Sequence, residues 1–286
     1  MFVWSSVCGV RPAVMGVVNV TPDSFSDGGR FATTDAAVAH GLTLVADGAD
    51  LLDIGGESSR PGAAPVDAGE EAARILPVIE ALAADSGVPI SVDTTKSAVA
   101  AAALAAGATI VNDISAGLAD RAMLGVVADA GVGYVAMHMR GAPRTMQEHA
   151  HYDDVVTEVG DHLIARRDAA LAAGVAADAL CVDPGIGFAK LAPHNLELLA
   201  RLDELTARVG VPVLVGASRK AFLGAVIEHA TGRRVEPAER DDATLATVMW
   251  SIDHGASVVR VHDVQPAAQC VRLWRTVRDL DAEAVA

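Results

Sequence analysis

Leu51-Leu-Asp-Ile-Gly-Gly56 is a short apolar run that leads directly into the polar cluster Glu57-Ser-Ser-Arg60, and this pattern occurs eight times in the chain of 286 residues. Each run has the length and composition of a strand buried on both faces, as in parallel sheets. Each polar cluster then lies at the C-terminal end of its strand. The other seven runs are Val14–Val20, Pro89–Val92, Ile110–Val111, Tyr134–Met137, Leu180–Val182, Val211–Ala217 and Val258–Val261.

Alanine-rich segments of helical character separate these runs, and most of them end in a glycine, which accepts the left-handed conformation just past a helix end. Alternating strands and helices predict βαβ units. Eight units without a Pro- or Ser-rich linker favour a single-domain (β/α)8 TIM barrel over a doubly wound sheet. The predicted helices are Thr34–Asp47, Asp67–Ala84, Lys96–Ala106, Arg121–Ala130, Val155–Ala173, His194–Arg208, Asp241–His254 and Pro266–Arg278. The terminating glycines are Gly48, Gly107, Gly131, Gly174, Gly210 and Gly255.

The barrel domain is expected over residues 14–280, after an N-terminal extension or hairpin over 1–13 and before a C-terminal tail over 281–286. Residues Phe2–Arg11 could plug the barrel floor, and Thr231–Arg240 reads as an exposed insertion. The net charge of −15 argues against binding to a nucleic-acid backbone, which requires clustered cations. Three widely spaced cysteines lack metal-ligand spacing and suit a reducing cytoplasm. No signal peptide or membrane span is expected, since no apolar run approaches 18 residues.

The strand ends carry candidate chemistry, because the active site of such a barrel lies at the C-terminal ends of its strands. Asp53, Asp93, Asp113 and Asp183 lie in or directly after apolar runs. A charge there is costly unless it is paired. Each carboxylate is therefore either a structural ion pair or loop cap, or an acceptor for a ligand rich in N–H donors. A dedicated zinc site is not expected, because no His/Asp pair has ligand spacing.

Two cationic triplets end the last two strands: Ser218-Arg-Lys220 and Arg260-Val-His262. Loops after strands seven and eight commonly bind phosphate in these barrels, although Arg260 could instead pair with Asp113 or Asp263. The residues alone thus predict carboxylates and an amide on one side of the mouth and a cationic side opposite. The glycine-rich loops Thr21–Gly29 and Glu57–Gly62 could be mobile lids or ordinary connections. An enzyme acting on a phosphorylated, donor-rich small molecule fits this arrangement.

A family resemblance rests on two long stretches, Met15-Gly-Val-Val-Asn-Val-Thr-Pro-Asp-Ser-Phe-Ser-Asp-Gly-Gly29 and Asp53-Ile-Gly-Gly-Glu-Ser-Ser-Arg-Pro-Gly62. With the shorter motifs that follow in order, they resemble the signatures of the dihydropteroate synthase family over about residues 14–280. The shorter motifs are Ser91–Thr94, Val111–Ile114, Met137–Met139, Asp183–Gly185, Val215–Lys220 and Val259–Asp263.

The resemblance implies a transferase of folate biosynthesis, a homodimer on the TIM-barrel fold. The family condenses (7,8-dihydropterin-6-yl)methyl diphosphate with 4-aminobenzoate, giving 7,8-dihydropteroate and diphosphate by an SN1-like loss of diphosphate. Mg²⁺ is the implied cofactor, bound near Asn19. The resemblance also implies that sulfonamide drugs, as mimics of 4-aminobenzoate, would be expected to target the enzyme. Since the aniline nitrogen is already nucleophilic, no strong general base is needed, and we expect a structural role for His138.

Site roles follow from the same resemblance, residue by residue. The implied catalytic residues are Lys220, Arg260, His262 and Asp93. The implied contacts of the pterin diphosphate are Ser59, Asp93, Asn112, Met137, Asp183, Lys220, Arg260 and His262. The implied 4-aminobenzoate and lid residues are Phe25, Asp27, Ser58, Arg60, Pro61, Phe188 and Ser218.

Two alternatives remain open from the sequence. A pterin-dependent methyltransferase shares the barrel and some pterin contacts but needs no grip on a diphosphate. A catalytically silent paralogue would bind pterin without turnover. The two complete loop signatures and the two cationic triplets favour the synthase.

Overall fold

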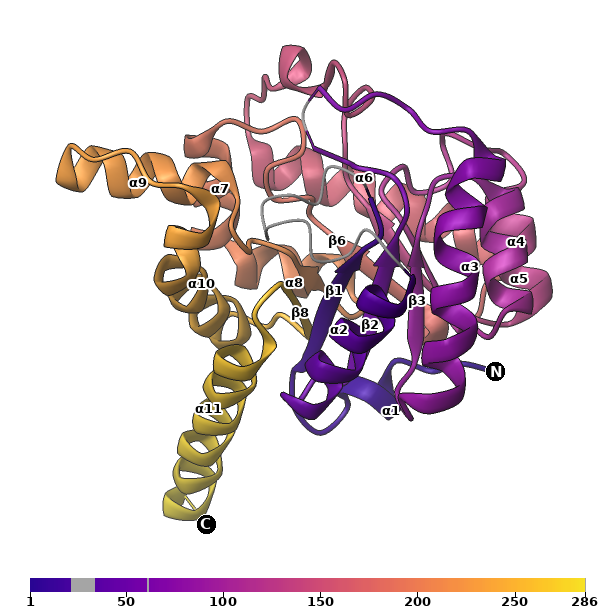
Figure 1. The fold of residues 1–286 in the computed structure, drawn as a ribbon. Coiled ribbons are helices and arrows are strands. Elements are labelled where there is room, and N and C mark those ends of the chain that lie inside the picture. The colour runs from indigo at the N-terminus through magenta and orange to yellow at the C-terminus, as the bar shows by residue number, and fades with distance from the viewer. Residues whose placement is uncertain (22–33, 61, 286) are drawn as a thin grey trace.

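Strands and helices alternate around a parallel barrel, as the repeat predicts (Figure 1). The computed structural model describes residues 1–21, 34–60 and 62–285. Within these residues one sheet runs in the order β6-β5-β4-β3-β2-β1-β8-β7, with every neighbouring pair parallel. Its strands are β1 (Ala13–Asn19), β2 (Leu51–Gly55), β3 (Ile90–Asp93), β4 (Ile110–Asp113), β5 (Gly133–Met137), β6 (Leu180–Asp183), β7 (Leu214–Val215) and β8 (Val258–Val261).

The seam between β6 and β7 nearly closes the barrel. A single parallel bridge joins Val182 to Val213, and the Val182 N–H donates to the Pro212 carbonyl at 2.9 Å. Since β7 is only two residues long, this seam has the weakest strand pairing. The single-domain (β/α)8 TIM barrel predicted from the sequence is confirmed.

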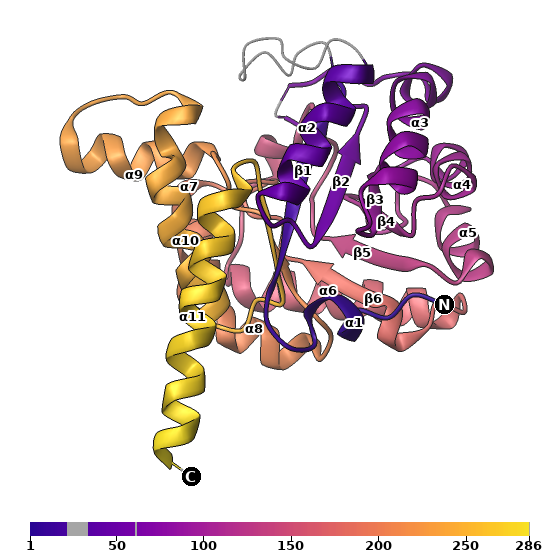
Figure 2. The ribbon, with the colours of Figure 1, turned by 60° about the horizontal axis from the view of Figure 1, so that its bottom comes forward.

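Helices cover the outside of the barrel, and α11 extends beyond it so that the C-terminus lies at its far tip (Figures 1 and 2). No helix in the described ranges is long and apolar enough to cross a membrane. All six glycines predicted to end helices have positive φ, between 63° and 110°. The helices are α1 (Ser5–Cys8), α2 (Thr34–Ala46), α3 (Ala68–Asp85), α4 (Ser97–Ala105), α5 (Met123–Ala130), α6 (Val155–Ala172), α7 (Ala192–Ala200), α8 (Leu202–Val209), α9 (Ala221–Thr231), α10 (Asp241–Asp253) and α11 (Val264–Val285).

Two helical regions differ from the prediction. The expected single helix His194–Arg208 is divided into α7 and α8 at Arg201, whose φ of −115° and ψ of 31° leave the helical region. Helix α9 was not predicted, although its apolar residues and Gly232, with φ of 69° just past its end, are helix signals. The expected exposed insertion Thr231–Arg240 therefore begins inside α9, and its last residues form a short 3₁₀ helix, Pro237–Arg240.

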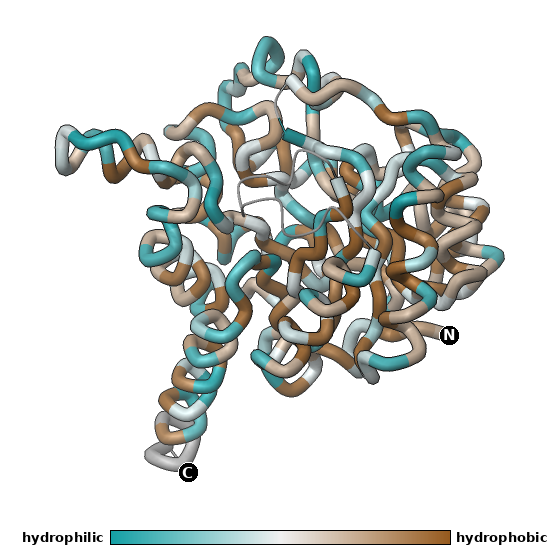
Figure 3. Tube along the Cα trace, viewed as in Figure 1, coloured by the Kyte–Doolittle hydropathy of each residue, from teal (hydrophilic) through white to brown (hydrophobic). Residues whose placement is uncertain are grey.

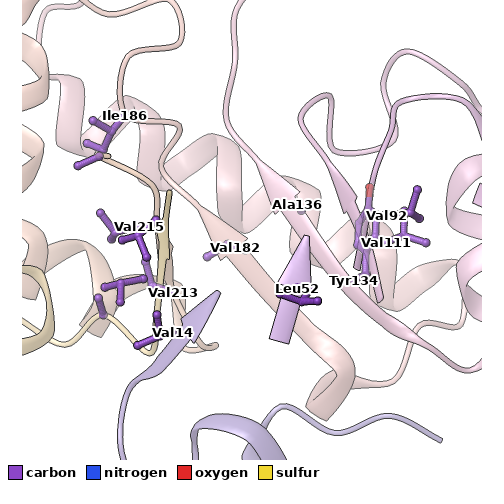
Figure 4. Close-up of a cluster of buried hydrophobic side chains, with 14 of the residues drawn as sticks. Val14, Leu52, Val92, Val111, Tyr134, Ala136, Val182, Ile186, Val213 and Val215 are labelled. Atoms are coloured by element: carbon purple, nitrogen blue, oxygen red, sulfur yellow. The ribbon is translucent and has the colours of Figure 1, made fainter. Parts of the chain in front are cut away.

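Hydrophobic residues are concentrated in the strands at the centre of the molecule (Figure 3). One set faces outward from the strands and packs against the helices. It includes Val14, Leu52, Val92, Val111 and Val182 (Figure 4). The alternate residues face the barrel interior and form an apolar floor near the N-terminal ends of the strands. The floor contains Ala13, Met15, Leu51, Ile110, Val135, Cys181, Leu214 and Val258.

The N-terminal segment packs beneath this floor. Trp4 is fully buried against the floor residues, and its indole N–H donates to the Ala179 carbonyl at 2.9 Å. The segment carries the short helix α1 (Ser5–Cys8). Because Trp4 fills this end, the opposite, C-terminal mouth is left for the polar residues.

Candidate active site

A polar layer crosses the barrel interior directly above the apolar floor. Side chains on a strand alternate between faces, so the residue two places after an inward apolar residue also faces inward. Counting two places from Leu51, Ile110, Val135, Cys181 and Val258 gives the members of this layer. They are Asp53, Asn112, Met137, Asp183 and Arg260.

Strand register brings further polar groups to the same level. Asn19 pairs with Gly55, Gly55 with Asp93, and Asp93 with Asn112, on four consecutive strands. A β-carbon added to Gly55 would lie 3.8 Å from both the Asn19 Oδ1 and the Asp93 Oδ2. These two oxygens therefore border one small space that the absent side chain of Gly55 leaves open.

Arg260 is held by two carboxylates. Its Nε donates to Asp53 Oδ2 at 2.6 Å and its Nη2 to Asp93 Oδ2 at 3.1 Å. Asp53 is fully buried and also accepts from Ser91 Oγ at 2.6 Å and from Asn112 Nδ2 at 3.0 Å. Asp53 thus aligns Arg260 and Asn112, which the resemblance implies as substrate-binding residues. The bonds of Arg260 to Asp53 and Asp93 occupy two of the five N–H donors of its guanidinium group.

Asp113 belongs to a separate, structural arrangement. It accepts from the Ser115 amide at 2.8 Å, from the Ser115 hydroxyl at 2.6 Å and from the Tyr134 hydroxyl at 3.0 Å. The Gly117 amide donates at 2.6 Å to Oδ2, the oxygen that also accepts from Tyr134, whereas both Ser115 groups donate to Oδ1. Asp113 therefore caps the loop after β4.

One alternative and one expectation about Arg260 are wrong. It pairs with neither Asp113 nor Asp263, the two partners considered as an alternative to phosphate binding. The mouth is also not divided into a carboxylate side and an opposite cationic side, because Arg260 lies between Asp53 and Asp93. The anionic and cationic groups of the site interleave.

Burial shifts the protonation of the carboxylates. Desolvation and, after it, the neighbouring Asp53 carboxylate raise the pKa of Asp93 to about 7, while the Arg260 guanidinium opposes the rise. Desolvation also raises the pKa of Asp183, against the effect of the Lys220 ammonium. A ligand that donates N–H groups would favour the ionised form of both carboxylates.

The loop after β6 shapes the pocket around Lys220. The Lys220 ammonium donates to the Ile186 carbonyl and lies 4.6 Å from the centre of the Phe188 ring. A β-carbon on Gly187 would come within 3.0 Å of Lys220 Cδ, so glycine leaves room for the lysine stem. Burial lowers the pKa of Lys220 to about 8, although Asp183 opposes the shift. Met137 is buried beside Asp183 in the strand register and completes an apolar wall.

His262 is oriented by Ser218. The hydroxyl of Ser218 accepts the His262 amide at 3.3 Å and lies 2.9 Å from His262 Nδ1. Because the Ser218 oxygen accepts a hydrogen bond from the His262 amide N–H, its own proton is available to donate to His262 Nδ1. Nδ1 is then the acceptor, so the neutral imidazole carries its proton on Nε2. Burial, followed by the nearby guanidinium groups of Arg219, Arg260 and Arg60, lowers the pKa of His262 to about 3. The ring is therefore a neutral donor at pH 7.

The loop after β2 borders a cavity of about 70 Å³ at the strand ends. Ser58 and Ser59 line this cavity together with Asp93 and Thr94. Arg60 is exposed, and its amide donates to Ser58 Oγ at 3.4 Å. The predicted lid residues Phe25, Asp27 and Pro61 lie outside the described residues.

His138, at the end of β5, pairs with a buried lysine. Its Nδ1 lies 2.8 Å from Lys190 Nζ, which also donates to the Gly185 and Phe188 carbonyls at 3.0 Å each. Burial lowers the pKa of His138 and that of Lys190. This geometry agrees with the structural role expected for His138. Lys190 thereby holds the loop after β6 in the conformation in which the Phe188 ring contacts the Lys220 ammonium.

Asp53 and Lys190 are the residues near the site whose roles sequence reasoning missed. Asp53 was considered as an ion pair, a loop cap or a ligand acceptor without a named partner, and the period-two count from Leu51 could have placed it beneath Arg260. Lys190 is one of three lysines in the chain and carried no other signal, because its partner His138 is 52 residues away.

The residues present fit the implied Mg²⁺. Within the described ranges no group of three or more His, Cys, Asp or Glu side chains could hold a metal ion. A protein cage is not required, however, because Mg²⁺ keeps several waters and binds through few protein ligands plus substrate phosphates. The Asn19 amide oxygen beside Gly55 is a ligand of suitable chemistry.

Comparisons with known proteins show the family to which the chain belongs. The family model of pterin binding enzymes matches residues 15–262. A dihydropteroate synthase from Mycobacterium leprae is 50% identical over 262 residues, covering 91% of each chain. A Xanthomonas albilineans dihydropteroate synthase structure with 4-aminobenzoic acid is 48% identical, with a TM-score of 0.85 and coverage of 94% of this chain and 93% of that one. A structure from the same organism with 7,8-dihydropteroate has 46% identity, a TM-score of 0.82 and 94% coverage of both chains.

Proposed function

The chain belongs to the pterin-binding enzyme family, and we propose that it condenses (7,8-dihydropterin-6-yl)methyl diphosphate with 4-aminobenzoate. The products are 7,8-dihydropteroate, a folate precursor, and diphosphate. One observation carries this proposal: the buried Asn112 and Asp183 and the half-buried Asp93 lie at one level of the barrel mouth with Lys220 and Arg260. Such a layer suits a ligand with many N–H donors next to a phosphate group.

The pterin ring would bind between the strand ends of β3, β4, β6 and β7. The carboxylates of Asp93 and Asp183 would accept from its ring N–H and amino groups, and Asn112 and Lys220 would complete the polar edge. Each charge-assisted hydrogen bond of this kind is worth about 1.5–3 kcal/mol. Met137, buried at the same level, offers an apolar contact to the ring.

The diphosphate would be bound by Arg260, His262 and Asn19, with Ser59 at its edge. When bound at Asn19, Mg²⁺ would supply further positive charge to the phosphate oxygens. In the reaction the C–O bond to the diphosphate breaks with the electron pair leaving on oxygen. The aniline nitrogen then bonds to the CH₂ carbon and loses a proton to solvent. Cationic groups that stabilise the departing charge lower this barrier.

The carbocation formed in this way must be kept from water. Ser58 and Ser59 line the cavity beside Asp93, which places their loop next to the proposed pterin site. We therefore propose that this loop, with the signature residues Phe25, Asp27 and Pro61, encloses 4-aminobenzoate, together with Phe188 and Ser218.

A homodimer is the proposed assembly. Helix α11 runs beyond the barrel (Figure 2), and its exposed Leu273, Val277 and Leu280 recur at helical spacing. An apolar stripe of this kind suits a second copy of the same helix region. We also propose a cytoplasmic location, since all three cysteines are described and unpaired, as suits a reducing compartment.

The test incubates the purified protein with the pterin diphosphate, 4-aminobenzoate and Mg²⁺ and separates the products by chromatography. Formation of 7,8-dihydropteroate, lost when either substrate is omitted, supports the proposal. Pterin binding without product would identify a silent paralogue. Methyl transfer from a methylated pterin to a corrinoid acceptor, in place of condensation, would identify a methyltransferase.

A further inference from the structure

Lys96 lies three residues after Asp93 and joins two carboxylates from different elements. Its ammonium contacts Glu57, which follows β2 by two residues, and Glu71 on α3. The Glu71 side chain is fully buried, whereas those of Lys96 and Glu57 are each 25% exposed. Removing the cation from a buried carboxylate is strongly unfavourable. Glu71 therefore fixes Lys96 in place, and Lys96 in turn fixes Glu57.

Glu57 closes the loop that begins with it. Its Oε1 accepts the Val66 amide at 3.2 Å while its Oε2 contacts Lys96, so one side chain joins both ends of the loop. The root of the loop is held as well, because Arg74 Nη1 donates to the Gly56 carbonyl at 2.8 Å. Loop 57–66 is thus anchored at both ends by charged side chains.

The middle of the loop is held by backbone hydrogen bonds. The Gly62 amide donates to the Pro143 carbonyl at 3.2 Å, the Ala63 amide to the Arg60 carbonyl at 3.0 Å, and the Arg60 amide to Ser58 Oγ at 3.4 Å. The second oxygen of Glu71, Oε1, has no hydrogen-bond partner in the described structure and borders the same cavity as Ser58. The charged contacts of Glu57 and Arg74 thus help to hold the loop over this cavity.

We propose that Lys96 is a positioning residue that sets the affinity for 4-aminobenzoate, by clamping loop 57–66 through Glu57 and Glu71. The inference rests on the proposed function, in which this loop encloses the second substrate. Lys96 touches no substrate in this account. The pterin site should be affected less, because Ser59 is its one proposed contact on this loop. Asp93 is held independently by Arg260 and by its strand pairing.

The main test compares Lys96→Met with the wild-type enzyme in steady-state kinetics. Met keeps the stem and removes the charge. The KM for 4-aminobenzoate should rise about tenfold while the KM for the pterin diphosphate changes less than about twofold. Lys96→Arg should restore the low KM, because a guanidinium can bridge both carboxylates. Equal changes in the two KM values, or no change in either, would overturn the proposal.

Glu57→Gln keeps the test decisive if Lys96→Met fails to fold. This variant leaves the buried Lys96–Glu71 pair intact and breaks only the link to the loop. It should raise the KM for 4-aminobenzoate and speed hydrogen–deuterium exchange of the Val66 amide at least about tenfold. An unchanged KM in an active enzyme, or unchanged exchange in any folded variant, would overturn the proposal.

Arg11→Met is the matched control. Arg11 forms a similar half-buried pair with Asp50, before the N-terminal ends of β1 and β2, and its loss should leave both KM values unchanged. A wild-type enzyme without product would refute the proposed condensation. The exchange measurement would still decide whether Lys96 clamps the loop.

Discussion

Replacing Asp53 by asparagine should disturb three donors at once. Ser91 donates to one oxygen of Asp53, and Asn112 and Arg260 donate to the other, at 2.6, 3.0 and 2.6 Å. Asparagine offers one acceptor oxygen and an NH₂ group that itself needs acceptors. Whichever way the amide is turned, Arg260 loses a charged partner inside a fully buried site, and Ser91 or the other two donors must change their hydrogen bonds.

The magnitude follows from the burial of the pair. Removing one partner of a buried ion pair costs about 3–5 kcal/mol. Arg260 retains Asp93 and its side chain is 21% exposed, which favours the lower end of that range. A loss of about 3 kcal/mol at roughly 2–4 °C per kcal/mol lowers Tm by about 6–12 °C. Because Arg260 loses its alignment, kcat/KM for the pterin diphosphate should fall about 100-fold.

Calorimetric melting and initial-rate kinetics measure both effects. Asp50→Asn is the control, since Asp50 also accepts from an arginine and a backbone amide but lies at the other end of β2. It should lower Tm slightly and leave kcat/KM within about twofold. If Asp53→Asn kept both the wild-type Tm and the wild-type kcat/KM, Asp53 would not be the residue that aligns Arg260.

Three further outcomes are expected. First, kcat/KM for the pterin diphosphate should fall as pH rises through about 8, where Lys220 loses its proton, and as pH drops through about 7, where Asp93 gains one. If the Lys220→Arg variant kept the same fall in rate at alkaline pH, that fall would belong to another group. Second, Lys190→Met should raise the KM for the pterin diphosphate about tenfold, because the loop after β6 loses its two bonds to Nζ and its link to His138. An unchanged KM would show that the loop holds its shape without Lys190. Third, Trp4→Ala should lower the free energy of unfolding, measured in urea, by about 3–5 kcal/mol. It should leave kcat unaltered, because Trp4 lies beneath the apolar floor of the barrel, away from the mouth. A large loss of kcat at unchanged stability would contradict that placement.

The sequence predicted the barrel, and the polar groups at its strand ends, because both depend on local patterns. Apolar runs ending in polar residues give the strands and their direction, and a period-two count could also have placed Asp53 and Asp183 on the inner face. Glycine after most helices gives the boundaries, as the positive φ of Gly107 illustrates. These signals lie within a few residues of one another, so no partner far along the chain is needed to interpret them.

Pairings between distant residues could not be predicted in this way. Arg260 bonds to Asp53 across 207 residues, and periodicity gives the face of a strand but not the partner. The break between α7 and α8 also depends on distant contacts, because the Arg201 side chain bonds to Asp154 on the preceding helix as well as to Glu197. The wrong prediction that carboxylates and cations occupy opposite sides of the barrel mouth has the same origin. Which charged side chains meet depends on the strand order around the barrel, and local patterns do not give that order.

The most direct test of the whole account is the ratio of diphosphate released to 7,8-dihydropteroate formed by the wild-type enzyme. If the strand ends bind the pterin diphosphate and the loops keep water from the carbocation, the ratio is one and both products vanish without 4-aminobenzoate. Diphosphate released without dihydropteroate would show that water reaches the carbocation. Bound pterin with neither product would contradict the proposed condensation itself.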